Sequence, residues 1–200
     1  MTIETPRLVL EPVTPRNAGV LWKLMQSGHL REYQDVPRYT RDEFQRRVAA
    51  RPKRLESRAI GRFEWVAAIA ESRVGIGWIS LRIGDHSRGV AEIGYSIVAS
   101  HRSKRYASEA ACAVIDCAFE TSDLRRIDAC CVPGNLPSRR LLARLDFVET
   151  HLQRHAAVVR GRPVDVCVYE MSRERWLAVR DRLAVDWGRE RPEDRAQSAN

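Results

Sequence analysis

The 200-residue chain has almost no lysine, no long apolar run and no cysteine pattern typical of a metal site. Of its 34 lysines and arginines only Lys23, Lys53 and Lys104 are lysine, so the net charge of +8 comes almost wholly from arginine. Such a skew often follows the base composition of a genome, and the basic segments lack the interleaved aromatic residues of nucleic-acid binders. The charge therefore permits an acidic partner, such as the ribosome, RNA or a nucleotide cofactor, without requiring one.

The other absences exclude further classes of protein. The longest apolar runs, such as residues 65–70, are far too short to span a bilayer, so we expect no membrane contact. The N-terminus lacks the basic start and apolar core of a signal peptide, which predicts a cytoplasmic protein. The five cysteines have no zinc-like spacing and their odd number fits a reducing compartment, so we expect packed, reduced thiols and no metal.

Length and composition predict one globular domain. Two hundred residues suit a single core, and the apolar share of 44% and charged share of 30% are those of a folded chain. We expect this domain to cover residues 1–185. A charged, disordered tail is expected over residues 186–200, where apolar periodicity is lost.

Hydrophobic periodicity and turn signals predict the order βααβββαβαββ, followed by a short helix. Alternating residues predict strands over 7–13, 63–70, 74–83, 90–98, 126–132, 147–152 and 164–169. Helical spacing predicts helices over 15–26, 41–50, 103–119, 135–145 and 173–183. Tight turns between the central strands favour antiparallel pairing, whereas strand–helix–strand units favour parallel pairing. The sequence therefore predicts an α+β domain with a mixed sheet.

Residues 91–119 are the most informative part of the chain. They are typical of a strand, a tight basic turn and a long apolar-faced helix. Such a turn brings backbone N–H groups and a helix N-terminus to one point, and both attract phosphate. Arg105 stands where a phosphate-binding loop normally has glycine, which tolerates unusual φ and close approach. Either the arginine grips a phosphate or points outward, or the site is degraded and only a basic helix start remains.

The order of elements and their landmarks resemble the GNAT acetyltransferases, in particular the RimJ/RimL-like branch that acetylates ribosomal-protein N-termini. The similarity spans nearly the whole chain. Its landmarks are Thr5-Pro6-Arg7-Leu8, Glu92-Ile93-Gly94-Tyr95, Tyr106-Ala107-Ser108-Glu109-Ala110, Asn135 with Ser138, and Asp165 through Trp176. The resemblance implies the acyl-CoA N-acyltransferase fold, a mixed and mostly antiparallel sheet flanked by helices. It also implies acetyl-CoA as the acyl donor and a primary amine as the acceptor, first of all a protein N-terminal α-amine such as that of a ribosomal protein.

The resemblance further implies which residues bind acetyl-CoA. The cofactor is expected at the end of one strand and on the turn after it, with its diphosphate on backbone amides and its pantetheine arm hydrogen-bonded by an asparagine. The matching positions are Ile97, Val98, Arg102, Ser103, Lys104, Arg105, Tyr106, Ala107 and Asn135. Asn135 is also a favoured helix N-cap, with Pro137 in the first turn, and capping and cofactor binding can coexist.

Glu92 and Ser138 are the candidates for proton transfer. Attack of an amine on a thioester needs a neutral amine, so a base must accept a proton directly or through water. Glu92 lies in an otherwise apolar strand, which is unusual for a carboxylate and frequent at functional sites, although it can equally face solvent or pair with an arginine. In the family pattern the residue that matches Ser138 protonates the departing thiolate.

Several other residues are interpreted as structural. Asp146 stands where the family usually has glycine, which predicts a changed turn with no bearing on chemistry. Tyr95, Tyr106 and Tyr169 are interpreted as core or sheet aromatics rather than as proton donors.

Two other functions stay open at the level of sequence. The acceptor can be a small amine such as an aminoglycoside, a polyamine or an amino acid. Alternatively, the chain is a non-catalytic GNAT-like domain that binds a protein or RNA partner through its arginine-rich surface, which the substituted Arg105 supports. The absence of a Cys/His or Ser/His/Asp arrangement favours direct attack in a ternary complex over a covalent relay. The loops over 27–40 and 151–162 carry no motif that identifies the acceptor, and the oligomeric state, a homodimer included, stays open.

Overall fold

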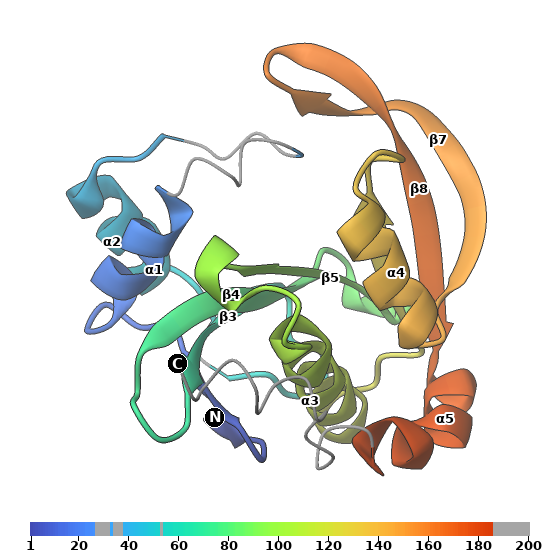
Figure 1. Ribbon diagram of the computed structural model, residues 1–200, viewed down its shortest axis with the longest axis horizontal. Coiled ribbons are helices and arrows are strands. Elements are labelled where there is room, and N and C mark those ends of the chain that lie inside the picture. The colour runs from blue at the N-terminus through green and yellow to red at the C-terminus, as the bar shows by residue number, and fades with distance from the viewer. Residues whose placement is uncertain (27–32, 34–37, 53, 186–200) are drawn as a thin grey trace, which may run out of the picture.

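An eight-stranded mixed sheet runs through the molecule, and helices cover both of its faces (Figure 1). The computed structural model describes residues 1–26, 33, 38–52 and 54–185. Within them the strands lie in the order β1-β2-β3-β4-β5-β6-β8-β7. The strands are β1 (Ile3–Glu4), β2 (Leu8–Pro12), β3 (Gly61–Ile69), β4 (Gly75–Ile83), β5 (Val90–Ile97), β6 (Arg126–Cys131), β7 (Val148–Val159) and β8 (Arg162–Ser172). The α-helices are α1 (Ala18–Met25), α2 (Arg41–Ala49), α3 (Tyr106–Thr121), α4 (Leu136–Arg144) and α5 (Arg173–Val185).

The predicted α+β class and the mixed, mostly antiparallel sheet are confirmed. Among the described strands β5 and β6 form the one parallel pair, and all other neighbours are antiparallel. The short strand β1 is not predicted, because two residues carry too little pattern. The tail expected over residues 186–200 lies outside the described part of the chain.

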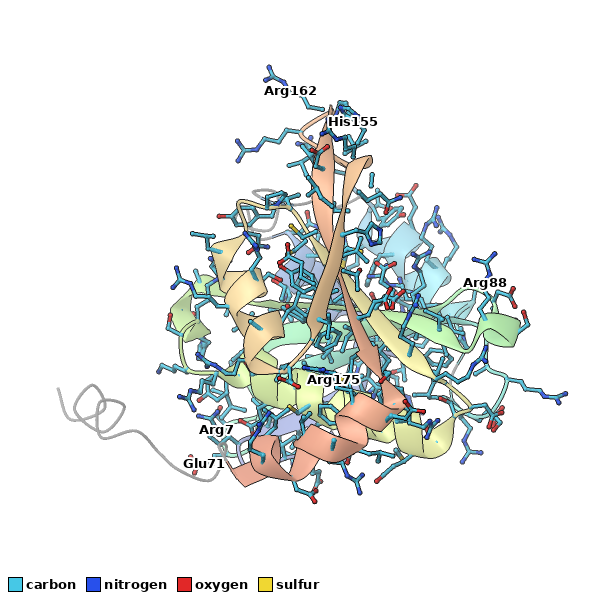
Figure 2. All side chains as sticks on the ribbon, turned by 90° about the vertical axis from the view of Figure 1, so that its right-hand side faces the viewer. Arg7, Glu71, Arg88, His155, Arg162 and Arg175 are labelled. Carbon is cyan, nitrogen blue, oxygen red and sulfur yellow. The ribbon has the colours of Figure 1, made fainter. Side chains whose placement is uncertain are left out.

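Two predicted boundaries are wrong for identifiable reasons. Helix α3 begins at Tyr106 rather than at residue 103, because Ser103 and Arg105 have a left-handed backbone with φ of 64° and 63°, which an α-helix does not accommodate. The β7–β8 hairpin is longer than predicted and its outer part is mostly exposed. Figure 2 shows it standing out from the sheet, with His155 and Arg162 at its outer end.

The central strands are buried on both sides, so they form continuous apolar runs. Trp65 and Ala67 of β3 face the main core, which α3 shares. The intervening Val66 faces a smaller core with Trp78 of β4 and Leu21 of α1. Alternate residues of one strand therefore hold helices α1 and α2 on one face and helix α3 on the other.

Helix α5 is fixed to α3 by polar contacts. The Arg173 guanidinium donates hydrogen bonds to the carbonyl oxygens of Phe119, Ser122 and Leu124 at the end of α3. Trp176 is buried and its indole N–H donates to Asp116 Oδ1 at 2.9 Å. The bonds from Arg173 to Phe119 and Ser122 satisfy carbonyl groups that a helix C-terminus leaves without an internal partner.

The turn after α4 has the hydrogen bonds of a regular helix end. The N–H groups of Asp146 and Phe147 donate to the carbonyls of Ala143 and Leu142 at 3.1 and 3.0 Å, the pattern that typically places glycine in left-handed backbone. Asp146 adopts that conformation, with φ of 68°. The prediction of a changed turn is therefore wrong: aspartate, which tolerates this region better than most residues, takes the place of glycine in an ordinary turn.

None of the helices in the described residues combines the length and the apolar character needed to cross a membrane.

Candidate active site

The parallel pair β5–β6 separates soon after it begins, and this separation defines the candidate active site. The strands pair over only three residues each, ending at Glu92 and Asp128. Beyond them β5 continues to Ile97 paired with β4, and β6 continues to Cys131 paired with β8. We call the point after Glu92 and Asp128 the fork. Helices α3 and α4 follow β5 and β6 along the chain, so both helix N-termini lie at the carboxyl ends of diverging strands, where open sheets bind ligands.

The turn between β5 and α3 has two left-handed residues, Ser103 and Arg105, on either side of Lys104. A non-glycine residue in this conformation costs roughly 1–2 kcal/mol, so the surrounding structure must maintain it. Arg105 precedes the first helical residue and is half-buried, and its side chain makes no capping hydrogen bond to α3. Arg105 thus keeps the backbone conformation that glycine adopts without strain.

The first turn of α3 presents backbone donors beside exposed cations. The N–H groups of residues 106–108 have no acceptor within the helix, because an α-helix leaves its first N–H groups without internal partners. Lys104 and Arg102 are exposed next to them. The Arg102 side chain also donates from Nε to the carbonyl oxygen of Ile97 at 3.3 Å. N–H groups, helix dipole and cations together favour an anion here.

The end of β5 is fixed closely against β4. Ile97 is buried in the main core, and the N–H of the half-buried Val98 donates to the carbonyl of Ile76 at 2.8 Å. Gly77 stands opposite Ile97, where an added Cβ would lie 2.2 Å from the carbonyl oxygen of Ser96. Glycine is therefore required at this close approach of the two strands.

Glu109, in the first turn of α3, connects the helix to the N-terminal strands. Its carboxylate is 1% exposed and accepts hydrogen bonds from Thr5 Oγ1 at 2.7 Å, from the Arg7 backbone N–H at 3.0 Å and from Arg7 Nε at 2.8 Å. The Arg7 guanidinium also lies 4.8 Å from the centre of the Tyr106 ring. Thr5 and Arg7, about a hundred residues before Glu109 in the chain, thus hold the start of α3 in place.

Glu92 lies at the fork and is paired with an arginine. Its carboxylate is 2.5 Å from Arg82 Nη2, and its side chain is 45% exposed. Arg82 stands directly opposite Glu92 in the antiparallel pair β4–β5. The structure therefore shows Glu92 partly exposed to solvent and paired with an arginine, which are two of the alternatives that the sequence left open. Glu92 also lies directly at the point where the strands separate.

Asp128 is the register partner of Glu92 on β6 and lies in a drier environment. Its carboxylate accepts a hydrogen bond from Arg126 Nη2 at 3.0 Å and lies 2.7 Å from Arg126 Nε. Arg126 Nη1 is also 3.2 Å from Glu170. Burial raises the pKa of Asp128, and the neighbouring Glu170 and Glu92 add to the rise while Arg126 opposes it. Burial, with Glu92 and Asp128 nearby, likewise raises the pKa of the Cys130 thiol to about 11, so this thiol is protonated at neutral pH.

Ser138 and Asn135 meet at the start of α4. Asn135 is the N-cap residue, and its side-chain oxygen accepts from the Ser138 backbone N–H at 3.2 Å, which confirms the predicted capping. The Ser138 hydroxyl lies 2.9 Å from the hydroxyl of Tyr95 on β5. This hydrogen bond connects β5 to α4 beyond the fork. Tyr95 packs on the core as predicted, but its hydroxyl contact is one that sequence reasoning missed.

A second polar cluster holds α4 to the end of the sheet. Tyr169 Oη donates to Glu149 Oε2 at 2.7 Å and accepts from Arg139 Nε at 3.0 Å, and Arg139 Nη2 is 3.1 Å from the same Glu149 oxygen. Burial, reinforced by Glu149, raises the pKa of Tyr169 to about 12, and the Tyr169 and Arg139 hydrogen bonds lower the pKa of Glu149. The sequence contains no local signal for this cluster, since its members come from α4, β7 and β8.

The two candidates for proton transfer lie on opposite faces of the sheet. Glu92 and Tyr95 are three residues apart on a strand without a register shift, so their side chains point to opposite faces. Ser138, bonded to Tyr95, therefore lies on the face that carries α3, whereas Glu92 lies on the face that carries α1. A thioester in the fork would have a carboxylate on one side and a hydroxyl on the other.

A family model described as an acetyltransferase (GNAT) domain matches residues 7–148. The uncharacterized N-acetyltransferase p20 of Bacillus licheniformis is 31% identical over 180 residues, which cover 88% of this chain and 98% of that protein. The chain belongs to the GNAT family. It is an N-acetyltransferase of that family, as its landmarks indicated.

Solved structures share the GNAT fold at lower identity. A ribosomal α-N-protein acetyltransferase, RimL, in complex with coenzyme A has a TM-score of 0.77 at 18% identity, covering 88% of this chain and 99% of that chain. RimJ of Mycobacterium smegmatis, in complex with a CoA-disulfide, has a TM-score of 0.73 at 21% identity, covering 94% of each chain.

Proposed function

We propose that this GNAT enzyme transfers an acetyl group from acetyl-CoA to the α-amine of a protein N-terminus by direct attack in a ternary complex. The observation that carries the proposal is the fork, where β5 and β6 separate after Glu92 and Asp128 and are followed by the N-termini of α3 and α4. An extended acyl donor that enters the fork has an anion-attracting turn at one end and proton-transfer groups at the other.

The residues at the turn fit the cofactor. The diphosphate would accept hydrogen bonds from the N–H groups of residues 106–108, with Arg102, Lys104 and Arg105 as neighbouring cations. Ser103 contributes the left-handed backbone that shapes the turn. The pantetheine arm, which contains two amides, would pair with the backbone of β5 that β6 no longer occupies. Its diphosphate end would lie near Ile97 and Val98, and its thioester end would lie at the fork.

Asn135 fits the pantetheine arm without losing its capping role. The cap uses only the side-chain carbonyl oxygen, and the amide NH₂ group keeps two N–H donors. One of them would donate to a pantetheine carbonyl. The same residue thus sets the start of α4 and contributes to cofactor binding.

The reaction needs one bond formed and one broken. The amine nitrogen attacks the thioester carbon, the C–S bond breaks, and the amine proton leaves to Glu92 directly or through a water molecule. Ser138 donates its proton to the departing sulfur on the other side and is reprotonated from solvent. The pair with Arg82 holds the Glu92 side chain in place, and direct transfer requires no covalent enzyme intermediate.

The choice of a protein acceptor rests on similar proteins of low identity. RimL is described as a ribosomal α-N-protein acetyltransferase, and a ribosomal-protein-S5-alanine acetyltransferase from Vibrio fischeri has a TM-score of 0.75 at 19% identity. The open approach to Glu92, whose side chain is 45% exposed, would admit a peptide end. These similarities support a protein N-terminus over a small amine.

The test has two stages. Acetyl-CoA at millimolar concentration should raise the Tm, because a ligand that binds the native state stabilises it; no shift would contradict donor binding. Acetylation is then measured on synthetic peptides that cover every encoded N-terminal residue, beside spermidine, an aminoglycoside and free amino acids. Faster turnover of a small amine than of any peptide would overturn the proposed acceptor class.

A further inference from the structure

We propose that Tyr95 is a positioning residue for acyl transfer, holding the Ser138 hydroxyl so that its proton points into the fork. The inference rests on the proposed function, in which Ser138 donates to the departing sulfur. It assigns a role to a side chain that the sequence indicated only as a core aromatic.

The contact joins the two arms of the fork. Tyr95 is three residues past Glu92, on the part of β5 that no longer pairs with β6. Its hydroxyl reaches across to Ser138 Oγ on α4, 2.9 Å away. Because β5 and α4 are connected here through side chains, the hydrogen bond fixes Ser138 relative to the strand along which the acyl donor is expected to lie.

Two separate contacts define where the serine hydroxyl lies. Asn135 fixes the backbone, since its side chain accepts from the Ser138 N–H. The hydroxyl itself can still occupy three staggered positions about χ1, and in a helix it can turn back toward a backbone carbonyl instead. The Tyr95 hydroxyl selects the position that faces β5. Backbone and side chain of Ser138 are thus held by different residues.

Either hydroxyl can be the donor in this 2.9 Å contact, and the proposed role requires the phenol to donate. Burial raises the pKa of Tyr95 far above neutral pH, against the opposing effect of its Ser138 hydrogen bond. Burial also raises the pKa of the neighbouring Cys131 thiol to about 11. The phenol therefore keeps its proton and can donate it to Ser138 Oγ. The proton of the serine then remains available for the sulfur, and the phenol disperses negative charge that develops on the serine oxygen.

The test is a double-mutant cycle in the full-length protein. Tyr95→Phe removes one oxygen atom and keeps the packed ring, so kcat should fall about tenfold, as expected for one hydrogen bond, with little change in KM for acetyl-CoA. Ser138→Ala should lower kcat by about 100-fold, whereas Ser138→Thr, which keeps a hydroxyl, should retain most activity. The double variant should be no slower than Ser138→Ala, because Tyr95 acts through Ser138.

Tyr169→Phe is the matched control. It also removes a buried phenol hydroxyl, but one bonded to Glu149 and Arg139, so its kcat should stay within about twofold of wild type despite lost stability. Three results would overturn the inference: unchanged kcat in Tyr95→Phe, full activity in Ser138→Ala, or a double variant whose loss is the product of the single losses. Absence of any turnover by the wild-type chain, with acetyl-CoA bound, would instead count against the proposed function.

Discussion

The turn after α4 and the turn before α3 each carry a charged residue in left-handed backbone, and the two side chains have different surroundings. Asp146, after α4, places its carboxylate 2.8 Å from Arg175 Nη2, and its carbonyl oxygen accepts from Arg175 Nε at 2.7 Å. Arg105, before α3, adds a third cation to a turn that already has Arg102 and Lys104. The Asp146 side chain contacts α5, whereas Arg105 lies in a turn where positive charge is concentrated, which would favour an external anion.

The comparison of Asp146 with Arg105 shows how a charged residue can stand at a position that usually has glycine. Both residues have nearly the same φ, 68° and 63°, so the backbone strain is similar and does not distinguish them. What distinguishes them is the charge of the residues around the side chain: Asp146 lies beside Arg175, whereas Arg105 lies beside Arg102 and Lys104. Asp146 is explained by its contact with α5 alone, whereas Arg105 is explained by a bound diphosphate under the proposed function. Variants of the two turns can separate these explanations.

The largest effect is expected where the α3 turn is anchored. Glu109→Gln replaces a buried carboxylate that accepts from Thr5 and Arg7 with an amide that leaves Arg7 without its counter-charge. We expect the free energy of unfolding to fall by about 2–4 kcal/mol, measured by chemical denaturation. Glu120→Gln on the exposed side of the same helix is the control and should cost under about 0.5 kcal/mol; equal losses would contradict the anchoring role.

Charge reversal at the α3 turn should act on binding rather than on stability. Arg105→Glu keeps a long side chain in the same strained backbone but would repel a diphosphate, so acetyl-CoA affinity should fall roughly 10- to 100-fold. Arg58→Glu is the control, because Arg58 is an exposed arginine with φ of 63° in the loop before β3. Titration calorimetry measures both. An unchanged affinity in Arg105→Glu would mean that the side chain points away from the diphosphate and does not contribute to its binding.

The α4 turn should show the opposite behaviour. Asp146→Ala loses the carboxylate contact to Arg175 Nη2 and places a less tolerant residue at positive φ, which should lower the free energy of unfolding by about 1–2 kcal/mol. Asp146→Gly loses the same contact but relieves the strain, so its stability should stay close to wild type. Both variants should bind acetyl-CoA normally, and a clear loss of binding would erase the contrast between the turns.

The smallest effect is expected for Arg105→Gly. Relief of the left-handed strain should raise the free energy of unfolding by up to about 1 kcal/mol, seen as a small rise in Tm. Affinity for acetyl-CoA should fall only a few-fold, because the backbone donors of α3 remain. An affinity higher than wild type would mean that the Arg105 side chain obstructs the turn.

The predictions that the structure confirms rest on patterns within a few consecutive residues. The start of α4 was predictable because Asn135 and Pro137 act within one helical turn. The beginning of α3 was not, because an arginine with positive φ gives no signal in the sequence. Pairing of Glu92 with an arginine was one of the alternatives left open, and the antiparallel register that places Arg82 opposite it supplies the partner.

Contacts between distant segments could not be predicted. Thr5, Arg7 and Glu109 were recognisable as landmarks, but nothing in the sequence shows that they touch. The Tyr95–Ser138 hydrogen bond depends on where β5 and β6 separate, which is a property of the sheet. The sequence therefore predicted which residue types lie at the candidate site. The residues that contact them from distant segments, such as Tyr95 at Ser138, could be identified only from the fold.

The central claim is that the turn before α3 holds the diphosphate of acetyl-CoA although Arg105 replaces glycine. The most direct measurement compares the affinity of the wild-type protein for acetyl-CoA and for S-acetylpantetheine, which lacks the diphosphate and the nucleotide. A diphosphate site at this turn predicts saturable binding of acetyl-CoA and binding of S-acetylpantetheine at least about 100-fold weaker. Equal affinities for the two thioesters, or no binding of acetyl-CoA at millimolar concentration, would contradict it.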